Sequence, residues 1–235
     1  GLRVTISRAQ SACASTASMF TAHYLATDSI QYGGDEAQKA RYLPRAASGE
    51  SLGAFGLTEP GAGSNPADMT TRAVREGDHY RLKGTKHFIS NAGAAAFIAV
   101  DKPTERTTSP VAGAADFIVV YAKTDMAAGA RGISAFVVER GMGVETGPAE
   151  RTMGLKGGHV FEVRIDARVP LANRLGPEGS GFRTALKTLD AGRLDIAACC
   201  VGIAEAAFAR ALDWARTRKV GGAPLAEFQG LQWMI

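Results

Sequence analysis

Apolar residues recur at helical spacing over the first fifty residues of the chain. In residues 9–31 and again in residues 36–47, apolar side chains return every three or four positions, which is the period of one helix face. Gly33-Gly34 separates the two segments, and Gly49 follows the second, where glycine commonly ends a helix. We therefore expect an N-terminal helical unit within residues 1–53.

The period changes to that of strands from about residue 54. Short apolar and β-branched runs alternate with turn residues, of which Gly77-Asp78 and Gly84 are expected to reverse the chain. This pattern predicts a compact β-barrel-like domain over residues 54–172. Its predicted strands span residues 71–75, 80–83, 85–90, 117–123, 133–139 and 160–167.

Helical spacing returns after Gly179-Ser180-Gly181. Apolar residues between positions 193 and 218 predict one long amphipathic helix, which Gly221-Gly222 ends before Pro224 begins another. These helices cannot bury their own apolar stripe, so residues 173–235 are expected to start a C-terminal helical bundle. The predicted fold class is α+β: N-terminal helices, a central β-barrel-like domain and the start of that bundle.

Composition is that of a globular protein, with 46% hydrophobic and 21% charged residues. The net charge of +4 is mild and the basic residues are dispersed, which argues against nucleic-acid binding. No apolar run approaches the roughly 20 residues of a membrane span. The histidines His23 and His87 have no second ligand at metal spacing, so no metal site is expected.

The three cysteines show no C-x-x-C spacing. Cys199 and Cys200 stand in an alanine-rich helical segment, and we expect buried apolar cysteine there. Unpaired cysteines favour a reducing compartment, which is the cytoplasm, or the mitochondrial matrix in a eukaryote.

A separate feature is that residues 92–100 nearly repeat in residues 112–120. A local duplication forming an exposed loop and an ordinary β-hairpin both explain this repeat.

The densest group of turn residues lies at positions 55–64, which read F-G-L-T-E-P-G-A-G-S. Three glycines and a proline in ten residues exclude a helix or a regular strand. The exposed backbone N–H groups and the hydroxyls of Thr58 and Ser64 can receive a large polar ligand. Alternatively, these hydroxyls only stabilise turns.

Four ordered motifs resemble those of the acyl-CoA dehydrogenase family. Residues 55–64 resemble the family loop T-E-P-x-A-G-S, and residues 84–93 resemble G-x-K-x-(W/F)-I-(T/S)-N. Residues 190–193 (D-A-G-R) and 218–229 resemble later helix motifs. The resemblance implies FAD-dependent α,β-dehydrogenation of an acyl-CoA thioester, with electrons passing to an electron-transferring flavoprotein. It also implies a homodimer or homotetramer.

The resemblance assigns roles to individual residues around the flavin. It places Thr58 on the isoalloxazine ring, Phe88 against the ring as an aromatic contact and Ser90 near flavin N5. Phe88 and Ile89 have a plainer alternative as strand core. The implied cofactor-binding residues are Phe55, Leu57, Thr58, Gly63, Ser64, Phe88, Ile89, Ser90, Arg218 and Gln229.

The implied substrate-binding residues are Ser64, Asp190 and Arg193. By resemblance, Ser64 reaches the coenzyme A side, while Asp190 and Arg193 match positions at its adenine and phosphate portions. A guanidinium suits phosphate geometry, but a helix-surface ion pair is the alternative for Arg193. Arg218 and Gln229 match residues that hold the FAD of the neighbouring subunit.

The chain departs from the family pattern at several positions. Asn65 stands where relatives have Asp, and Gly221 replaces an aromatic residue. The usual Glu base lies beyond residue 235, its alternative position is Gly192, and Glu59 is not the base by family position. We therefore expect no catalytic base here and the central portion of a longer protein. A non-catalytic binding or assembly module, or a flavin oxidase of the same superfamily, is the alternative function.

Overall fold

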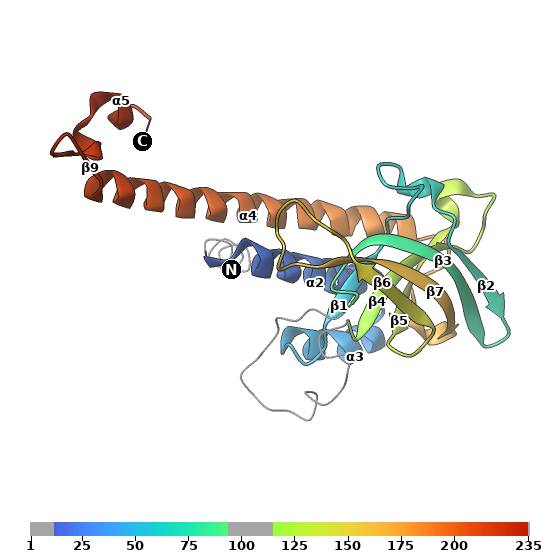
Figure 1. The fold of residues 1–235 in the computed structure, drawn as a ribbon. Coiled ribbons are helices and arrows are strands. Elements are labelled where there is room, and N and C mark those ends of the chain that lie inside the picture. Colours follow the sequence, from blue (N-terminus) through green and yellow to red (C-terminus); the bar gives the residue numbers. More distant parts are fainter. Residues whose placement is uncertain (1–11, 94–114, 235) are drawn as a thin grey trace.

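The structure is a computed structural model that describes residues 12–93 and 115–234 of the chain. A curved sheet lies beside two N-terminal helices, and one long C-terminal helix runs past both (Figure 1). Most of the repeat predicted at residues 92–120 lies outside the described residues. No helix in the described ranges is long and apolar enough to cross a membrane.

The two predicted N-terminal helices are confirmed as α2 (Ala14–Gly33) and α3 (Glu36–Ala47). The second begins with a capping box, in which Gln38 N donates to Asp35 Oδ1 (2.8 Å) and Asp35 N donates to Gln38 Oε1 (3.0 Å). The Gln38 amide also donates to the carbonyl of Ala172 (2.7 Å). The start of α3 is therefore tied to the far end of the β region.

Eight strands form one sheet in the order β6-β7-β3-β2-β4-β5-β8, with β1 added parallel to β4. The edge strands β6 and β8 do not pair with each other, so in the described chain the sheet is open rather than a closed barrel. The strands are β1 (Gly53–Gly56), β2 (Arg72–Glu76), β3 (His79–Ser90), β4 (Phe117–Lys123), β5 (Ile133–Glu139), β6 (Val144–Ala149), β7 (Val160–Pro170) and β8 (Arg174–Leu175).

The predicted turn at Gly84 is wrong, because β3 runs continuously through this residue. Gly84 serves a close approach instead: a Cβ there would lie 2.3 Å from Thr71 Oγ1 and 2.7 Å from Thr71 Cα. The turn at Gly77-Asp78 is confirmed, since β2 ends at Glu76 and β3 begins at His79. Strands β1, β6 and β8 were not predicted. Phe55 and Gly56 belong to β1 rather than to the loop, because they pair with β4, whereas β6 is mostly exposed and β8 has two residues.

The sheet curls around one apolar core and packs its outer side against the helices. Strands β4 and β5 are buried on both faces, which explains their continuous apolar sequences. Alternate residues Ile118 and Val120 of β4 face strands β3 and β7 across the inner core. The residues between them, Phe117 and Val119, pack against α2 and α3. This strong curvature accounts for barrel-like patterning in an open sheet.

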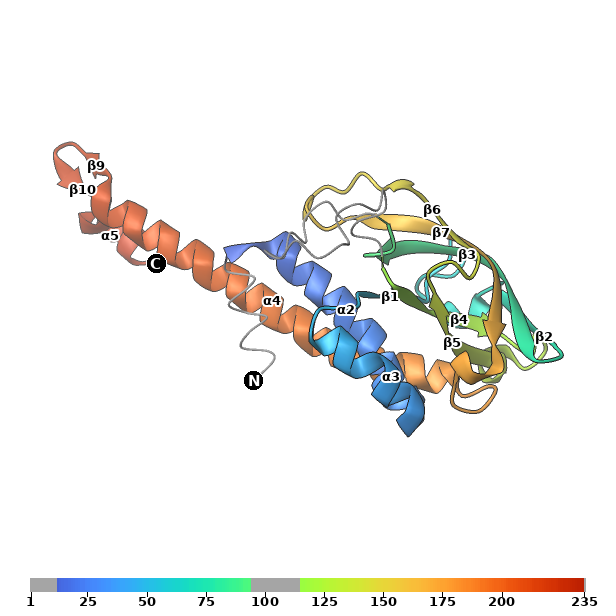
Figure 2. The ribbon, with the colours of Figure 1, turned by 90° about the horizontal axis from the view of Figure 1, so that it is seen from below.

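The long helix α4 spans Gly181–Thr217, which confirms the predicted return of helix after Gly179-Ser180-Gly181 and continues without a break into the long helix predicted between 193 and 218. Its first half packs on α2 and the sheet, and its second half extends past them (Figures 1 and 2). Cys199 is buried as predicted, but Cys200 is exposed, because adjacent residues lie about 100° apart around a helix and Cys199 is the one that packs with Ala17 of α2. The helix predicted from Pro224 is present as a 3₁₀ turn followed by one turn of α-helix. The elements after α4 are β9 (Lys219–Val220), β10 (Ala223–Pro224), η5 (Leu225–Glu227) and α5 (Gln229–Gln232).

Candidate functional site

A cleft of about 400 Å³ opens between the loop after β1, the end of β3, and helices α2 and α4. It therefore joins segments from the helical and the β parts of the fold. Its lining is mainly apolar, with hydroxyls and one guanidinium placed around it. The lining residues are Ala22, Leu25, Phe55, Leu57, Thr58, Gly63, Ser64, Pro66, Phe88, Ile89, Ser90, Leu186, Leu189 and Arg193.

Eight of the ten residues predicted to bind the cofactor line this one cleft, all from the segments 55–64 and 88–90. The other two, Arg218 and Gln229, lie at the opposite end of α4 and beyond it (Figure 1). Of the predicted substrate-binding residues, Ser64 and Arg193 border the cleft. The fold thus brings most of the predicted residues to one cleft and places Arg218 and Gln229 away from it.

The loop at positions 57–64 is closed by backbone hydrogen bonds. Glu59 N donates to Ala62 O, and Ala62 N donates to Glu59 O, both at 3.1 Å. His87 N donates to Thr58 O (2.8 Å), which joins the loop to β3. A Cβ on Gly63 would meet no atom within 4 Å, so this side of the loop is open to a ligand. The loop therefore presents its backbone and hydroxyls to the cleft.

A buried ion pair lies beneath the loop. Lys86 Nζ, whose side chain is fully buried, donates to Glu59 Oε1 (2.9 Å) and Leu57 O (3.0 Å). Glu59 also accepts from Thr70 N (2.6 Å) and Thr71 N (3.0 Å). With these donors around it, Glu59 anchors the loop from inside rather than facing the cleft.

Both charges of the pair have shifted pKa values. Burial works to raise the pKa of Glu59, but the Lys86 ammonium and the hydrogen bonds from Thr70 and Thr71 outweigh it and lower this pKa to about 2. Burial lowers the pKa of Lys86 to about 8, against the opposing effect of Glu59. The two groups are therefore both charged near neutral pH.

Strand β3 has a bulge where it reaches the cleft. Its pairing with β7 shifts register between Lys86 and Ile89, and Phe88 takes a left-handed backbone conformation with φ of 58°. Ile89 is 1% exposed and belongs to the core, whereas the Phe88 side chain borders the cleft and the residue is 60% exposed. The strand-core alternative therefore describes Ile89 but not Phe88. Aromatic residues rarely adopt positive φ, and such outliers gather at functional sites.

Arg193 pairs with Asp190 one turn earlier on α4, and both side chains are about 70% exposed. The helix-surface ion pair considered for Arg193 is therefore present. Arg193 also borders the cleft, whereas Asp190 does not line it directly. The guanidinium can thus face an anionic group at the rim while Asp190 holds it from the helix surface.

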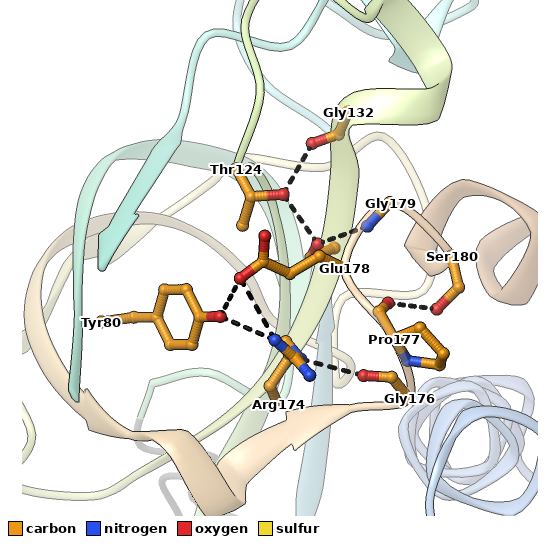
Figure 3. A network of polar contacts seen from close by, with 10 residues as sticks. Tyr80, Thr124, Gly132, Arg174, Gly176, Pro177, Glu178, Gly179 and Ser180 are labelled. Carbon is orange, nitrogen blue, oxygen red and sulfur yellow. Dashed lines mark hydrogen bonds and ion pairs between the residues drawn. The ribbon is translucent and has the colours of Figure 1, made fainter. Parts of the chain in front are cut away.

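A polar network fixes the start of α4 against the sheet (Figure 3). Arg174 Nη1 donates to Tyr80 OH (2.7 Å) and to Glu178 (3.2 Å), and the Tyr80 hydroxyl donates to Glu178. Gly179 N donates to Ser134 Oγ (2.9 Å) on β5. Because the cleft residues Leu186 and Leu189 follow within three turns, this network sets where the α4 wall of the cleft stands.

Sequence reasoning missed the helical wall of the cleft. Leu25 on α2 and Leu186 and Leu189 on α4 are ordinary apolar helix positions, and their spacing alone does not reveal which neighbour they face. It also missed His87 and Glu150, whose side chains form a pair at the bulge with Nε2 2.8 Å from Oε1. Their separation of 63 positions hides this pair in the sequence.

Comparison with known proteins agrees with this geometry. Three family models, described as the N-terminal, middle and C-terminal domains of acyl-CoA dehydrogenase, match residues 4–50, 54–109 and 179–235. The chain belongs to the acyl-CoA dehydrogenase family. The expected family and α+β class are thereby confirmed, with the sheet open instead of closed.

Relatives in this family are similar over nearly the whole chain. The short-chain specific acyl-CoA dehydrogenase of Clostridium acetobutylicum is 40% identical over 99% of this chain and 57% of its own length. The caffeyl-CoA reductase-Etf complex subunit CarC of Acetobacterium woodii is 41% identical over 90% of this chain and 51% of its own length. The structure of butyryl-CoA dehydrogenase from Megasphaera elsdenii superposes with a TM-score of 0.86 and 37% identity, over 97% of this chain and 55% of that one. The chain thus spans about half the length of the relatives it matches.

Proposed function

We propose that this chain contributes the flavin cleft of an enzyme that dehydrogenates an acyl-CoA thioester to the enoyl-CoA. The observation that carries the proposal is the gathering of eight predicted cofactor residues around one cleft. The names of the relatives support it, since they include dehydrogenases and a reductase of acyl-CoA compounds. FAD is the proposed cofactor, and it supplies the hydride acceptor when bound.

The residues present fit such a group. Phe88 offers an exposed aromatic face for a planar ring, and Thr58 and Ser90 offer hydroxyls at the cleft for its polar edge. The open side of the loop at Gly63 lets a ligand approach the backbone. Leu57, Ile89 and the leucines of α4 would exclude water from the ring, and Arg193 would bind phosphate oxygens of coenzyme A.

Arg218 and Gln229 are proposed to bind the FAD of a second copy of the chain. Arg193 and Arg218 are 25 residues apart along α4, which corresponds to about 37 Å at 1.5 Å per helical residue. Arg218 therefore does not reach the cleft of its own chain. This distance supports a homodimer or homotetramer in which each α4 extends toward the cleft of a neighbour.

The electron acceptor is proposed to be an electron-transferring flavoprotein. The relative from Acetobacterium woodii is named as a subunit of a reductase-Etf complex, which supports this partner. We also propose three domains over residues 1–53, 54–172 and 173–235. The matched family models, whose bounds are 4–50, 54–109 and 179–235, support this division.

The test is a visible absorbance titration of the purified chain with FAD, followed by anaerobic addition of butyryl-, isobutyryl- or octanoyl-CoA. We expect saturable FAD binding, with an affinity that falls in Phe88→Ala. Bleaching of the flavin band by one thioester would establish dehydrogenation. Reoxidation by oxygen would identify an oxidase. Bound flavin that no thioester or enoyl-CoA alters would mean that the chain is a non-catalytic binding module or a portion of the enzyme without its base. Absence of FAD binding would contradict the proposal.

A further inference from the structure

The β3 bulge stacks two neighbouring rings on each other. The rings of His87 and Phe88 have centroids 4.1 Å apart and planes 8° from parallel. In a regular strand, successive side chains point to opposite faces, so adjacent residues cannot stack. The register shift between Lys86 and Ile89 and the positive φ of Phe88 bring the two rings onto one side. The stacked pair is therefore a product of the bulge.

The imidazole is held at its edge by a hydrogen bond. His87 Nε2 donates to Glu150 Oε1 (2.8 Å), and the backbone of Glu150 donates to Val160 O (2.9 Å) at the start of β7. His87 N donates to Thr58 O (2.8 Å) in the loop. Backbone and side chain of His87 are thus both fixed, by two segments that are distant in sequence.

The Phe88 ring has less support of its own. The residue is 60% exposed, in a backbone conformation that disfavours an aromatic side chain. A stacked imidazole covers one face of the ring and leaves the other face available. A ring with one face covered by a fixed partner is oriented before any ligand arrives, which lowers the ordering cost of binding a planar group.

We infer that His87 is a positioning residue: anchored by Glu150, it holds the Phe88 ring in the orientation that stacks on a planar ligand in the cleft. That the ligand is the isoalloxazine ring rests on the proposed function. The positioning itself is a property of the chain, so it can be measured without flavin.

The first measurement is fluorine NMR of the chain with 4-fluorophenylalanine in place of phenylalanine. The Phe88 resonance is identified by its loss in Phe88→Leu. We expect His87→Ala to move this resonance, His87→Tyr to restore it by replacing one stacked ring with another, and Glu150→Ala to move it partway. His79→Ala is the matched control, because His79 begins the same strand on the exposed hairpin and should leave the resonance unchanged.

The second measurement is the dissociation constant for FAD in the same variants. Loss of an aromatic pair should weaken binding about two- to tenfold in His87→Ala, and His87→Tyr should recover most of the loss. A general structural role for His87 would not be rescued by tyrosine. If His87→Ala does not unfold cooperatively on heating, Glu150→Ala and His87→Tyr carry the test.

An unchanged Phe88 resonance in the folded His87→Ala and Glu150→Ala variants would overturn the inference, whatever the chain binds. A moved and tyrosine-restored resonance supports it, and does so even if the wild-type chain binds no FAD. That second case would contradict the proposed function alone. The positioning role of His87 and the proposed flavin function can therefore be contradicted independently.

Discussion

Single residues determine whether the loop beside the cleft keeps its shape, and the Lys86–Glu59 pair is the main example. Breaking a buried ion pair by removing one partner leaves an uncompensated charge, whereas replacing both partners is often neutral. The pair lies under the segment that carries Thr58 and Ser64, so its loss should affect both stability and the cleft.

Lys86→Met should lower the free energy of unfolding by about 3–5 kcal/mol, because Glu59 stays buried without its counter-charge. The double variant Lys86→Met/Glu59→Gln should recover most of this loss. Urea denaturation followed by circular dichroism measures both. A Lys86→Met loss within 1 kcal/mol would show that water or another cation compensates Glu59.

The same pair predicts an acid sensitivity. The folded-state pKa of Glu59 is lowered to about 2 from an ordinary value of 4.5. The ionised carboxylate therefore contributes fully to the free energy of unfolding above pH 4.5, and this contribution is lost as the pH falls toward 2. Between pH 4.5 and pH 2, the wild-type chain should lose about 3 kcal/mol more free energy of unfolding than Lys86→Met/Glu59→Gln, which lacks the titrating pair. Denaturation midpoints at several pH values give the comparison. If the free energy of unfolding of the two proteins changed with pH in the same way, the prediction would be contradicted.

Among single residues, the sequence predicted those that line the cleft better than those that support them. Thr58, Ser64 and Phe88 could be found because they stand inside recognisable local motifs. Lys86 and Glu59 are 27 residues apart, and only the crossing of β3 under the loop brings them together. A lysine in a strand otherwise reads as a solvent-exposed residue, so its burial could not be predicted from local pattern.

Among the elements, β3 shows most clearly how a strand can be misinterpreted from its glycine. The sequence suggested two strands with a turn at Gly84, yet the backbone passes straight through. Glycine is required there because Thr71, just before β2, packs directly against it. Strands β4 and β5 were predicted with their observed bounds, since burial on both faces gives long apolar runs. Sheet closure could not be predicted, because it depends on pairing between strands far apart in sequence.

Gly84→Ala should therefore destabilise the fold by about 1–3 kcal/mol, as overpacking against a fixed backbone does. Gly147→Ala in β6 is the matched control, because its nearest neighbour would be 3.6 Å from the new Cβ. Thermal unfolding should show a lower midpoint for the first variant and little change for the second. Equal midpoints would mean that β2 can move away from β3 at no cost.

For the whole molecule, the placement of Arg218 far from its own cleft yields a complementation test. If Arg218 serves the cleft of a second copy, Phe88→Ala and Arg218→Ala should each weaken FAD binding alone. Unfolding and refolding the two variants together in equal amounts should restore about a quarter of the sites, since half of the dimers are mixed and each holds one intact combination. Recovery of no sites would show that Arg218 acts on its own chain or not at all. Equilibrium dialysis with FAD counts the sites.

The unbroken length of helix α4 has a mechanical consequence. Its 37 residues run without a break from the polar network at Tyr80 and Arg174, past the cleft, to the β9–β10 hairpin. A continuous helix is stiff, so it transmits a tilt along its length as a lever does. A second copy that packs on the outer half would therefore also change the angle at which Leu186 and Leu189 face the β3 bulge. In the proposed assembly, the width of the cleft and the contact between subunits would therefore be coupled through α4.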